Sequence, residues 1–159
     1  MNNRAVGKTN SEDKDFVDLS GDGGLFKKII KPGNGEQIPK DVVAIVHYTG
    51  KLTNGDVFDS SKQRNQPFEF NIGKRDVILG WDHGVQTMTK GEVAILKCSP
   101  DYAYGSRSVG PIPGNSTLLF EVELLGWKER DQSFMTQILA VLVVGAIALY
   151  FFYNRNGWK

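Results

Sequence analysis

The sequence predicts an α+β domain, in which an antiparallel β-sheet wraps around one short α-helix, followed by a single C-terminal transmembrane helix. Three observations predict this arrangement. Most apolar residues between Leu25 and Lys128 alternate with polar ones, as in half-buried strands. One stretch of the same region has helical spacing instead. A separate run near the C-terminus is apolar on every face of a helix.

The 159 residues include 19 Lys and Arg against 18 Asp and Glu, which gives a net charge of +1. This length suits one ordinary domain with tails and excludes a large multidomain machine. The balanced charge argues against nucleic acid as a partner, because neutralising phosphates needs a clustered excess of Lys and Arg. One cysteine, Cys98, excludes an intramolecular disulfide framework.

The N-terminal segment 1–24 contains three basic and five acidic residues and few large apolar ones. This composition predicts a solvated, disordered arm. The segment also lacks the apolar stretch of a secretory signal peptide.

The folded domain is predicted over residues 25–128, with strands separated by turn sequences. Apolar residues alternate from Val42 to Tyr48 and from Ala94 to Cys98. In TLLFEVELL the apolar side chains face one way, and Glu121 and Glu123 face the other. The turn signals are Pro32 to Gly35, Asn54-Gly55 and Lys90-Gly91. These runs predict antiparallel strands.

The single helix is predicted within VILGWDHGVQTM, residues 77–88. Trp81, Val85 and Met88 follow one another at spacings i, i+4 and i+7, which puts them on one helical face. One amphipathic helix among strands predicts a sheet that covers the apolar face of this helix.

Residues 132–154 contain no ionisable acid or base, and 17 of the 20 residues from Phe134 to Tyr153 are apolar. A helix of this length spans roughly 30 Å, the thickness of the hydrocarbon core of a bilayer. We therefore expect a linker at 129–133, a transmembrane helix at 134–153 in contact with the lipid bilayer, and a short basic tail at 154–159.

The place of this run near the C-terminus, together with the absent signal peptide, predicts a tail anchor with the folded domain facing the cytosol. The endoplasmic reticulum and the mitochondrial outer membrane both suit the short basic tail, and a prokaryotic inner membrane stays open. The N-glycosylation sequence Asn115-Ser116-Thr117 would instead indicate a lumenal domain if it were used.

The common catalytic and cofactor-binding motifs do not occur in the sequence. His47 and His83, the two histidines, lack the spacing of a zinc site, and there is no P-loop, nucleophile elbow or dinucleotide-binding loop. Cys98 falls on the inward face of a strand, which is typical of an inert buried thiol. We therefore expect no cofactor and no metal.

Aromatic residues are spread over several predicted elements, and any single ring is most simply explained as core packing. Two local patterns stand out. VFDSS, residues 57–61, places the carboxylate of Asp59 directly after Phe58. PDYAYG, residues 100–105, places two tyrosines in a turn-rich loop.

These patterns, in this order, resemble the FKBP-type peptidyl-prolyl cis-trans isomerases. The resemblance covers about residues 24–127 and runs through VHYTGKLTNGDVFDSS, NQPFEFNIGKRDVILGWDHGV, SPDYAYGS and IPGNSTLLFEVELL. It implies a five- or six-stranded antiparallel sheet that curls around the short helix, with an apolar pocket between them.

The resemblance also implies the residues of this pocket. Trp81 would form the floor, and Asp59, held near Tyr48 and Arg64, would be the one carboxylate. The Tyr104 hydroxyl and the backbone N–H of Ile78 would bind substrate carbonyls. The implied catalytic residues are Tyr48, Phe58, Asp59, Trp81 and Tyr104. The implied substrate-binding residues are Arg64, Phe68, Val77, Ile78, Ile112 and Phe120.

The implied activity is isomerisation of X-Pro bonds in protein substrates, in support of protein folding, with macrolide immunosuppressants as further ligands. This reaction needs no nucleophile, because its barrier of about 18–20 kcal/mol comes from lost amide resonance. A dry aromatic pocket lowers the barrier by removing the water that favours the planar amide. The alternative is a membrane-tethered scaffold or chaperone of the same fold, in which isomerisation is incidental.

Overall fold

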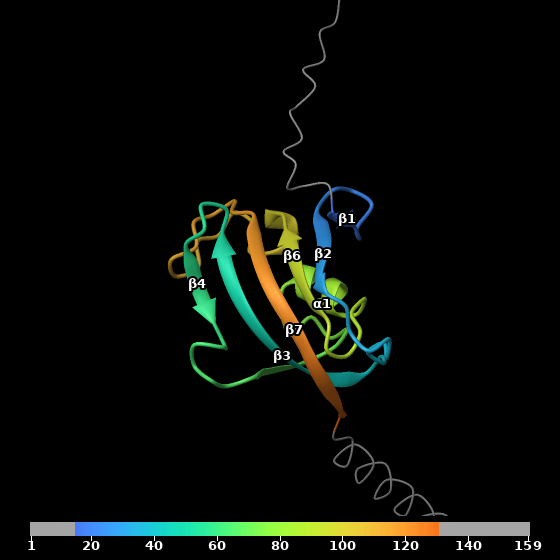
Figure 1. Cartoon of the computed structure of the whole chain (residues 1–159). Coiled ribbons are helices and arrows are strands. Elements are labelled where there is room, and N and C mark those ends of the chain that lie inside the picture. The colour runs from blue at the N-terminus through green and yellow to red at the C-terminus, as the bar shows by residue number, and fades with distance from the viewer. Residues whose placement is uncertain (1–14, 131–159) are drawn as a thin grey trace, which may run out of the picture. The chain divides into compact units, whose positions relative to one another are not determined.

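The computed structural model describes residues 15–130, in which one antiparallel sheet surrounds a short helix (Figure 1). The strands are β1 (Val17–Asp18), β2 (Leu25–Lys31), β3 (Val42–Leu52), β4 (Val57–Ser60), β5 (Phe68–Asn71), β6 (Val93–Cys98) and β7 (Leu118–Glu129). The helix α1 spans Leu79–Val85, and Pro100–Tyr102 forms a turn of 3₁₀ helix. Within these residues the predicted fold class is confirmed.

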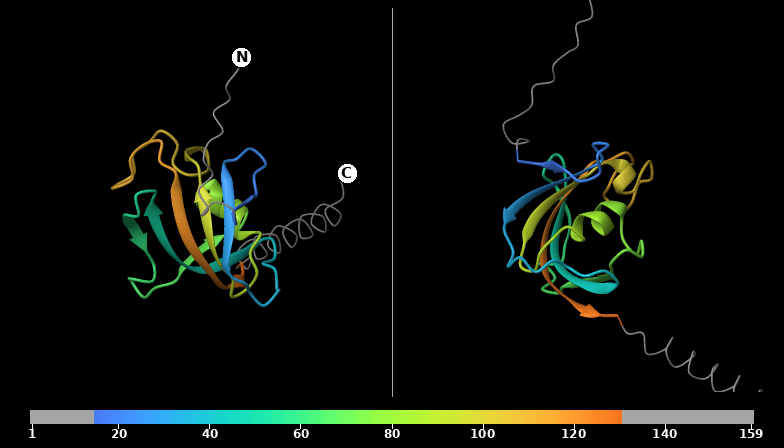
Figure 2. Two further views of the ribbon diagram at one scale, coloured as in Figure 1. Left: turned by 45° about the horizontal axis from the view of Figure 1, so that its top comes forward. Right: turned by 90° about the vertical axis from the view of Figure 1, so that its right-hand side faces the viewer.

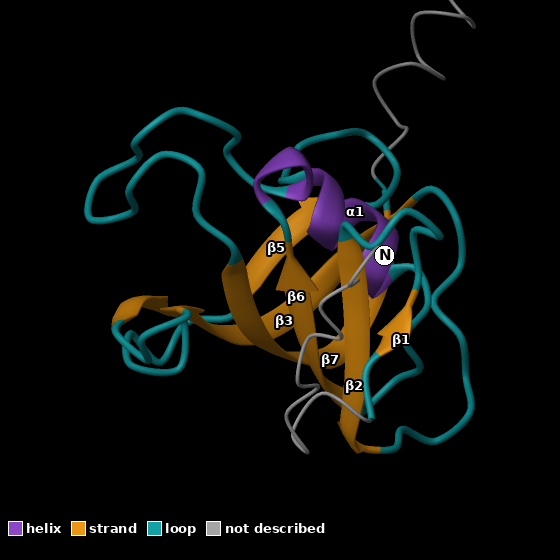
Figure 3. Ribbon diagram, turned by 90° about the horizontal axis from the view of Figure 1, so that it is seen from above, coloured by secondary structure: helices purple, strands orange, loops and turns teal. Residues whose placement is uncertain are grey.

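The sheet is strongly curved, and α1 lies on its concave side (Figures 2 and 3). The strand order is β1-β2-β6-β7-β3-β4, and β5 also pairs with β3. β3 pairs with β7 along its whole length, and on its other side it pairs with β5 and then with β4. The resemblance implied five or six strands, whereas the structure has seven, because loop 61–67 divides one edge into β4 and β5 and the two-residue β1 is added.

The concave face of the sheet carries the core. Every second residue of β3 from Val42 to Tyr48 is buried, and so is every second residue of β6 from Ala94 to Cys98. Along β7, buried apolar side chains alternate with the partly exposed Glu121 and Glu123. The alternation in the sequence therefore corresponds to the two faces of the sheet, as predicted.

The helix α1 is shorter than the stretch that predicted it. Trp81 and Val85 lie on the helix, whereas Met88 follows in a turn and is still fully buried. Gly80 lets α1 approach β6 closely, since a Cβ atom at this position would lie 2.3 Å from the Sγ of Cys98. This close packing fixes the depth at which Trp81 sits against the sheet.

Ordered structure begins before residue 25, the predicted start of the domain. β1 pairs with β2, and the Asp18 carboxylate accepts hydrogen bonds of 2.9–3.0 Å from the backbone N–H groups of Ser20, Gly21 and Gly23. This segment was predicted to belong to a disordered arm over 1–24. It joins the sheet because backbone pairing and a hydrogen-bonded turn order it without much apolar burial. Residues 1–14 lie outside the described residues.

The predicted membrane span at 134–153 and the basic tail at 154–159 also lie outside the described residues. Between residues 15 and 130, no helix is long and apolar enough to cross a membrane. The linker predicted at 129–133 begins where β7 ends, at Glu129.

Candidate active site

A pocket with a volume of about 440 Å³ opens between the helix, the sheet and two loops. Strands β3, β4, β5 and β7 and helix α1 contribute side chains, and loops 72–78 and 103–107 complete the wall. The lining residues are Tyr48, Phe58, Asp59, Phe68, Arg75, Asp76, Val77, Ile78, Trp81, Ala103, Tyr104, Arg107 and Phe120. Most of this lining is aromatic or aliphatic, and four of its side chains are charged.

Trp81 is the centre of the aromatic lining and is only 4% exposed. Its ring makes edge-to-face contacts with Tyr48, Phe68 and Phe120 at centroid distances of 4.9, 5.8 and 5.4 Å. The ring of Phe58 meets Phe120 in the same way at 5.6 Å. Edge-to-face pairs are favourable beyond their buried area, so the rings hold one another in place and form a preformed apolar surface.

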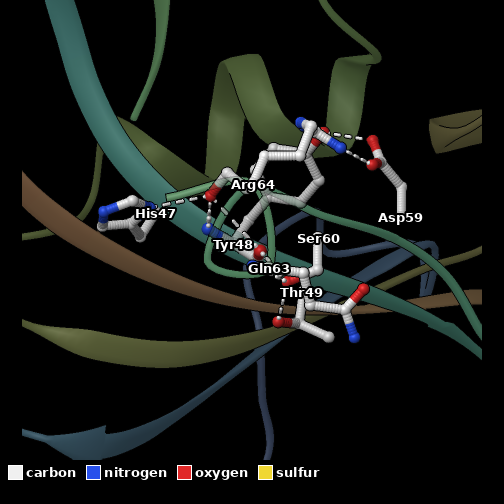
Figure 4. A network of polar contacts seen from close by, with 8 residues as sticks. His47, Tyr48, Thr49, Asp59, Ser60, Gln63 and Arg64 are labelled. Carbon is white, nitrogen blue, oxygen red and sulfur yellow. Dashed lines mark hydrogen bonds and ion pairs between the residues drawn. The ribbon is translucent and has the colours of Figure 1, made fainter. Parts of the chain in front are cut away.

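Asp59 lies at one end of a polar network beside this surface (Figure 4). The Tyr48 hydroxyl donates to one oxygen of the Asp59 carboxylate, and the Arg64 guanidinium donates to the other. The guanidinium also donates to the Tyr48 hydroxyl at 3.2 Å. Tyr48 itself is 8% exposed, so the network anchors a buried ring of the pocket.

The network sets the protonation of both residues. Burial acts to raise the pKa of Asp59, but the hydrogen bonds from Tyr48 and Arg64 and the positive charge of Arg64 outweigh burial and lower this pKa. Burial and the hydrogen bond to Asp59 raise the pKa of Tyr48. At neutral pH, Asp59 is therefore an ionised acceptor and Tyr48 a protonated donor.

A second layer of hydrogen bonds holds β4 against β3 below Asp59 (Figure 4). The fully buried hydroxyl of Ser61 accepts a hydrogen bond from the Tyr48 backbone N–H at 2.8 Å and lies 2.9 Å from Nδ1 of His47. The hydroxyls of Thr49 and Ser60 lie 3.0 Å apart. These contacts fix the register between β3 and β4 that sets Asp59 beside Tyr48. His47 takes part in them and does not line the pocket.

Loop 72–78, which forms one wall, is held by a buried carboxylate on α1. Asp82 is 3% exposed, and its carboxylate accepts hydrogen bonds from the backbone N–H groups of Gly73 at 2.6 Å and Arg75 at 3.3 Å. Both residues have positive φ angles, 72° for Gly73 and 59° for Arg75. Asp82 therefore stabilises a loop conformation that is unfavourable at Arg75 and that positions Val77 and Ile78. The sequence did not reveal this role, because acidic residues are common in the first turn of a helix, where they interact favourably with the helix dipole.

The buried indole N–H of Trp81 has no acceptor among residues 15–130. The two donors that the resemblance implied for substrate binding, the hydroxyl of Tyr104 and the backbone N–H of Ile78, also have none there. Burial, together with the negative charge of Asp59, raises the pKa of Tyr104, so its hydroxyl stays protonated. Both donors are available to a carbonyl oxygen that enters the pocket.

Nine of the eleven residues predicted for the site line the pocket. Arg64 does not, and it acts on the pocket through Asp59 and Tyr48. Ile112 was predicted to bind substrate, but it is 5% exposed and outside the lining, because its backbone pairs with Val109 and its side chain turns into the core. Asp59 is also not the one carboxylate, since Asp76 lines the same pocket.

Four lining residues were not among the eleven predicted for the site: Arg75, Asp76, Ala103 and Arg107. They lie in loops with no apolar periodicity, so no pattern in the sequence shows where their side chains go.

The thiol of Cys98 faces the core rather than the pocket. The side chain is fully buried, and burial raises the pKa of Cys98 to about 12. This is an unreactive thiol, as predicted. Over residues 15–130, no cluster of three or more His, Cys, Asp or Glu side chains could hold a metal ion.

Comparisons with known proteins relate this pocket to one family. A family model described as FKBP-type peptidyl-prolyl cis-trans isomerase matches residues 34–125. FK506-binding protein 1A of Aspergillus fumigatus is 58% identical over 106 residues, which cover 65% of this chain and 94% of that protein.

Two further proteins share the domain. FK506-binding protein 59 of Drosophila melanogaster is 51% identical over 119 residues, which cover 74% of this chain but 27% of that protein, so this chain spans about a quarter of its length. The crystal structure of AtFKBP13 has a TM-score of 0.65 with this chain at 37% identity, and the match covers 71% of this chain and 98% of that one.

Proposed function

The chain belongs to the FKBP-type peptidyl-prolyl cis-trans isomerases, and we propose that this isomerase acts on X-Pro bonds of protein substrates while it is tethered to a membrane. The observation that carries the proposed site is the preformed aromatic pocket, in which two unpaired hydrogen-bond donors face an apolar surface around Trp81. Such a pocket suits a reaction that needs desolvation and fixed donors but no nucleophile.

We infer that the pocket accelerates rotation about the X-Pro bond in two ways. The planar amide is the more dipolar state, so water stabilises it more than the twisted transition state, and the apolar lining removes this water. The Tyr104 hydroxyl and the Ile78 N–H hold carbonyl oxygens of the substrate in a geometry that favours the twist. An acceleration of a thousandfold requires only about 4 kcal/mol, which a few such contacts can supply.

The Asp59 network supports this role indirectly. Its hydrogen bond to Tyr48 fixes an aromatic wall, and its negative charge is compensated by Arg64. The carboxylate is ionised at neutral pH and therefore makes the pocket wall more polar but has no proton to donate to the substrate.

The activity is tested with the full chain in a non-ionic detergent. Exchange NMR on a peptide with a central Leu-Pro bond measures cis-trans interconversion, and we expect catalytic amounts of protein to accelerate it. A macrolide of the FK506 type, which relatives are named for binding, should inhibit by occupying the same pocket. No acceleration by a protein whose near-UV circular dichroism shows a folded core would contradict the proposal.

Membrane tethering rests on the apolar run from Phe134 to Tyr153. We propose that this run anchors the isomerase in the endoplasmic reticulum or the mitochondrial outer membrane. The test images a fluorescent fusion of the full chain against markers of both membranes, beside a fusion that lacks residues 134–159. We expect membrane fluorescence only from the full chain, and diffuse fluorescence from both fusions would refute the anchor.

We further propose that the isomerase domain faces the cytosol. Asn115 provides the test, since it is exposed and lies in an N-glycosylation sequence. A domain in the cytosol keeps the unmodified mass. A mass that falls on glycosidase treatment in the wild-type chain, but not in the Asn115→Gln variant, would place the domain in the lumen instead.

A further inference from the structure

Two arginines, Arg75 and Arg107, lie in the wall of the mostly apolar pocket. Arg75 comes from the loop before α1 and Arg107 from the loop after the 3₁₀ turn, and both side chains are exposed. Neither guanidinium has an ion pair or a hydrogen-bond partner among residues 15–130. Two separate loops therefore present guanidinium groups without a direct partner at the same pocket.

The acidic residues of the pocket are already engaged. Asp59 is bonded to Arg64 and Tyr48. The carboxylate of Asp76 accepts a hydrogen bond from the Asn71 side-chain amide at 2.7 Å and lies 3.3 Å from the Asn71 backbone N–H. Counting Arg64, the site has three arginines and two aspartates, an excess of one positive charge, and the arginines that line the pocket are the ones without partners.

An acidic side chain is not expected to bind at the floor of the pocket, which Trp81 and the neighbouring rings form. A carboxylate there would lose its hydration, and this loss costs free energy. The exposed guanidinium groups of Arg75 and Arg107 lie in the pocket wall, where they would meet the residues of a substrate that flank the X-Pro bond. Arginine is well suited to this contact, since its planar fork of donors matches a carboxylate.

From this arrangement, and on the premise of the proposed isomerase activity, we propose that the isomerase selects X-Pro bonds flanked by acidic residues, with Arg75 and Arg107 as the residues that determine the preference. The apolar pocket takes the X-Pro unit, and the two arginines attract the carboxylates next to it. An exposed ion pair is weak, so two of them give a preference of about fivefold in kcat/KM at low salt.

The test uses three peptides with the same central Ala-Leu-Pro-Phe sequence and flanks of Glu, Gln or Lys on both sides. The full chain in a non-ionic detergent is assayed by exchange NMR at about 0.01 M and about 1 M salt, where the Debye length falls from about 30 to about 3 Å. We expect kcat/KM to rank Glu above Gln above Lys at low salt and the three values to converge at high salt. Equal values at low salt, or a preference for Lys, overturn the proposal.

The Gln-flanked peptide separates this proposal from the isomerase activity itself. If it is isomerised while the Glu-flanked peptide is no better, only the selectivity is wrong. If none of the three peptides is isomerised, the activity is wrong and the selectivity fails with it.

Variants test whether the two arginines cause the preference. For each variant, kcat/KM for the Glu-flanked peptide is divided by kcat/KM for the Gln-flanked peptide. A general effect of the substitution on the pocket changes both values and leaves this ratio unchanged. We expect the Arg75→Gln/Arg107→Gln variant to lower this ratio to about one. The matched control is Lys74→Gln, which neutralises the neighbouring residue of the same loop, whose ammonium pairs with Asp41 at 3.0 Å and lies outside the lining. The control should keep the ratio, and a double variant that also keeps it overturns the assignment.

Discussion

The hydroxyl of Tyr48 donates a hydrogen bond to the carboxylate of Asp59 and thereby links a buried ring of β3 to the polar edge of β4. The two residues are eleven positions apart in the chain. The β3–β4 register brings them together, since it sets Gly50 opposite Asp59. The Asp59 carboxylate therefore helps to hold the Tyr48 ring, together with Arg64 and the neighbouring rings.

Asp59→Asn should lower kcat/KM roughly tenfold, because the charged hydrogen bonds to Tyr48 and Arg64 are lost and the Tyr48 ring is less firmly held. Exchange NMR on the Leu-Pro peptide measures the loss. Asp56→Asn is the matched control, since Asp56 is exposed in the turn before β4 and its carboxylate accepts a hydrogen bond only from the Asn54 side chain. Equal activity of the two variants would exclude a role for the Asp59 charge.

The activity should be constant between about pH 5 and pH 9. The pKa of Asp59 is lowered, while the pKa values of Tyr48 and Tyr104 are raised, so none of these groups changes its charge in this range. Neither histidine lines the pocket. The measurement is kcat/KM across this range, and an inflection near neutral pH would reveal a titrating group that the site geometry does not supply.

Tyr104→Phe should reduce kcat/KM about two- to tenfold, because one neutral hydrogen bond to the substrate is removed while the ring remains. Tyr102→Phe removes a similar hydroxyl nearby, one that bonds Asp22 at 3.2 Å and faces away from the lining. This control should retain the wild-type rate. The proposed contact of Tyr104 is disproved if the two variants have the same rate.

Asp82→Asn should raise KM more than it lowers kcat, because it loosens a wall of the pocket without removing a group that contacts the substrate. The amide keeps one acceptor oxygen, but its NH2 group would face a backbone N–H of Gly73 or Arg75. Amide chemical shifts of these two residues report the wall directly. Unchanged shifts together with an unchanged KM would show that Asp82 does not position the loop.

Lys27→Met should destabilise the domain by about 3–5 kcal/mol, because it leaves the Glu92 carboxylate buried without its counter-charge. Lys27 Nζ lies 3.0 Å from Glu92, and the side chains are only 10% and 4% exposed. Lys28→Met is the control, since Lys28 forms a more exposed pair with Asp15 and should cost at most about 1 kcal/mol. Urea unfolding of the full chain in detergent compares the two, and equal losses would refute the distinction.

Features that depend on neighbouring residues could be predicted from the sequence. Alternation along β3 and β7 predicted which side chains enter the core, since successive residues of a strand point to opposite faces. The pair Asn54-Gly55 predicted the β3–β4 turn, where Gly55 has a φ of 94° that few other residues adopt. Most pocket residues were also predicted, because they lie in long motifs that resemble one family.

The positions of the loop side chains, in contrast, follow from the tertiary structure. It brought Arg75 and Arg107 to one pocket, turned Ile112 into the core and made Asp82 the support of a wall. None of these placements follows from local spacing. Each depends on hydrogen bonds and packing between residues of different elements, and such contacts exist only once the curved sheet has closed around the helix.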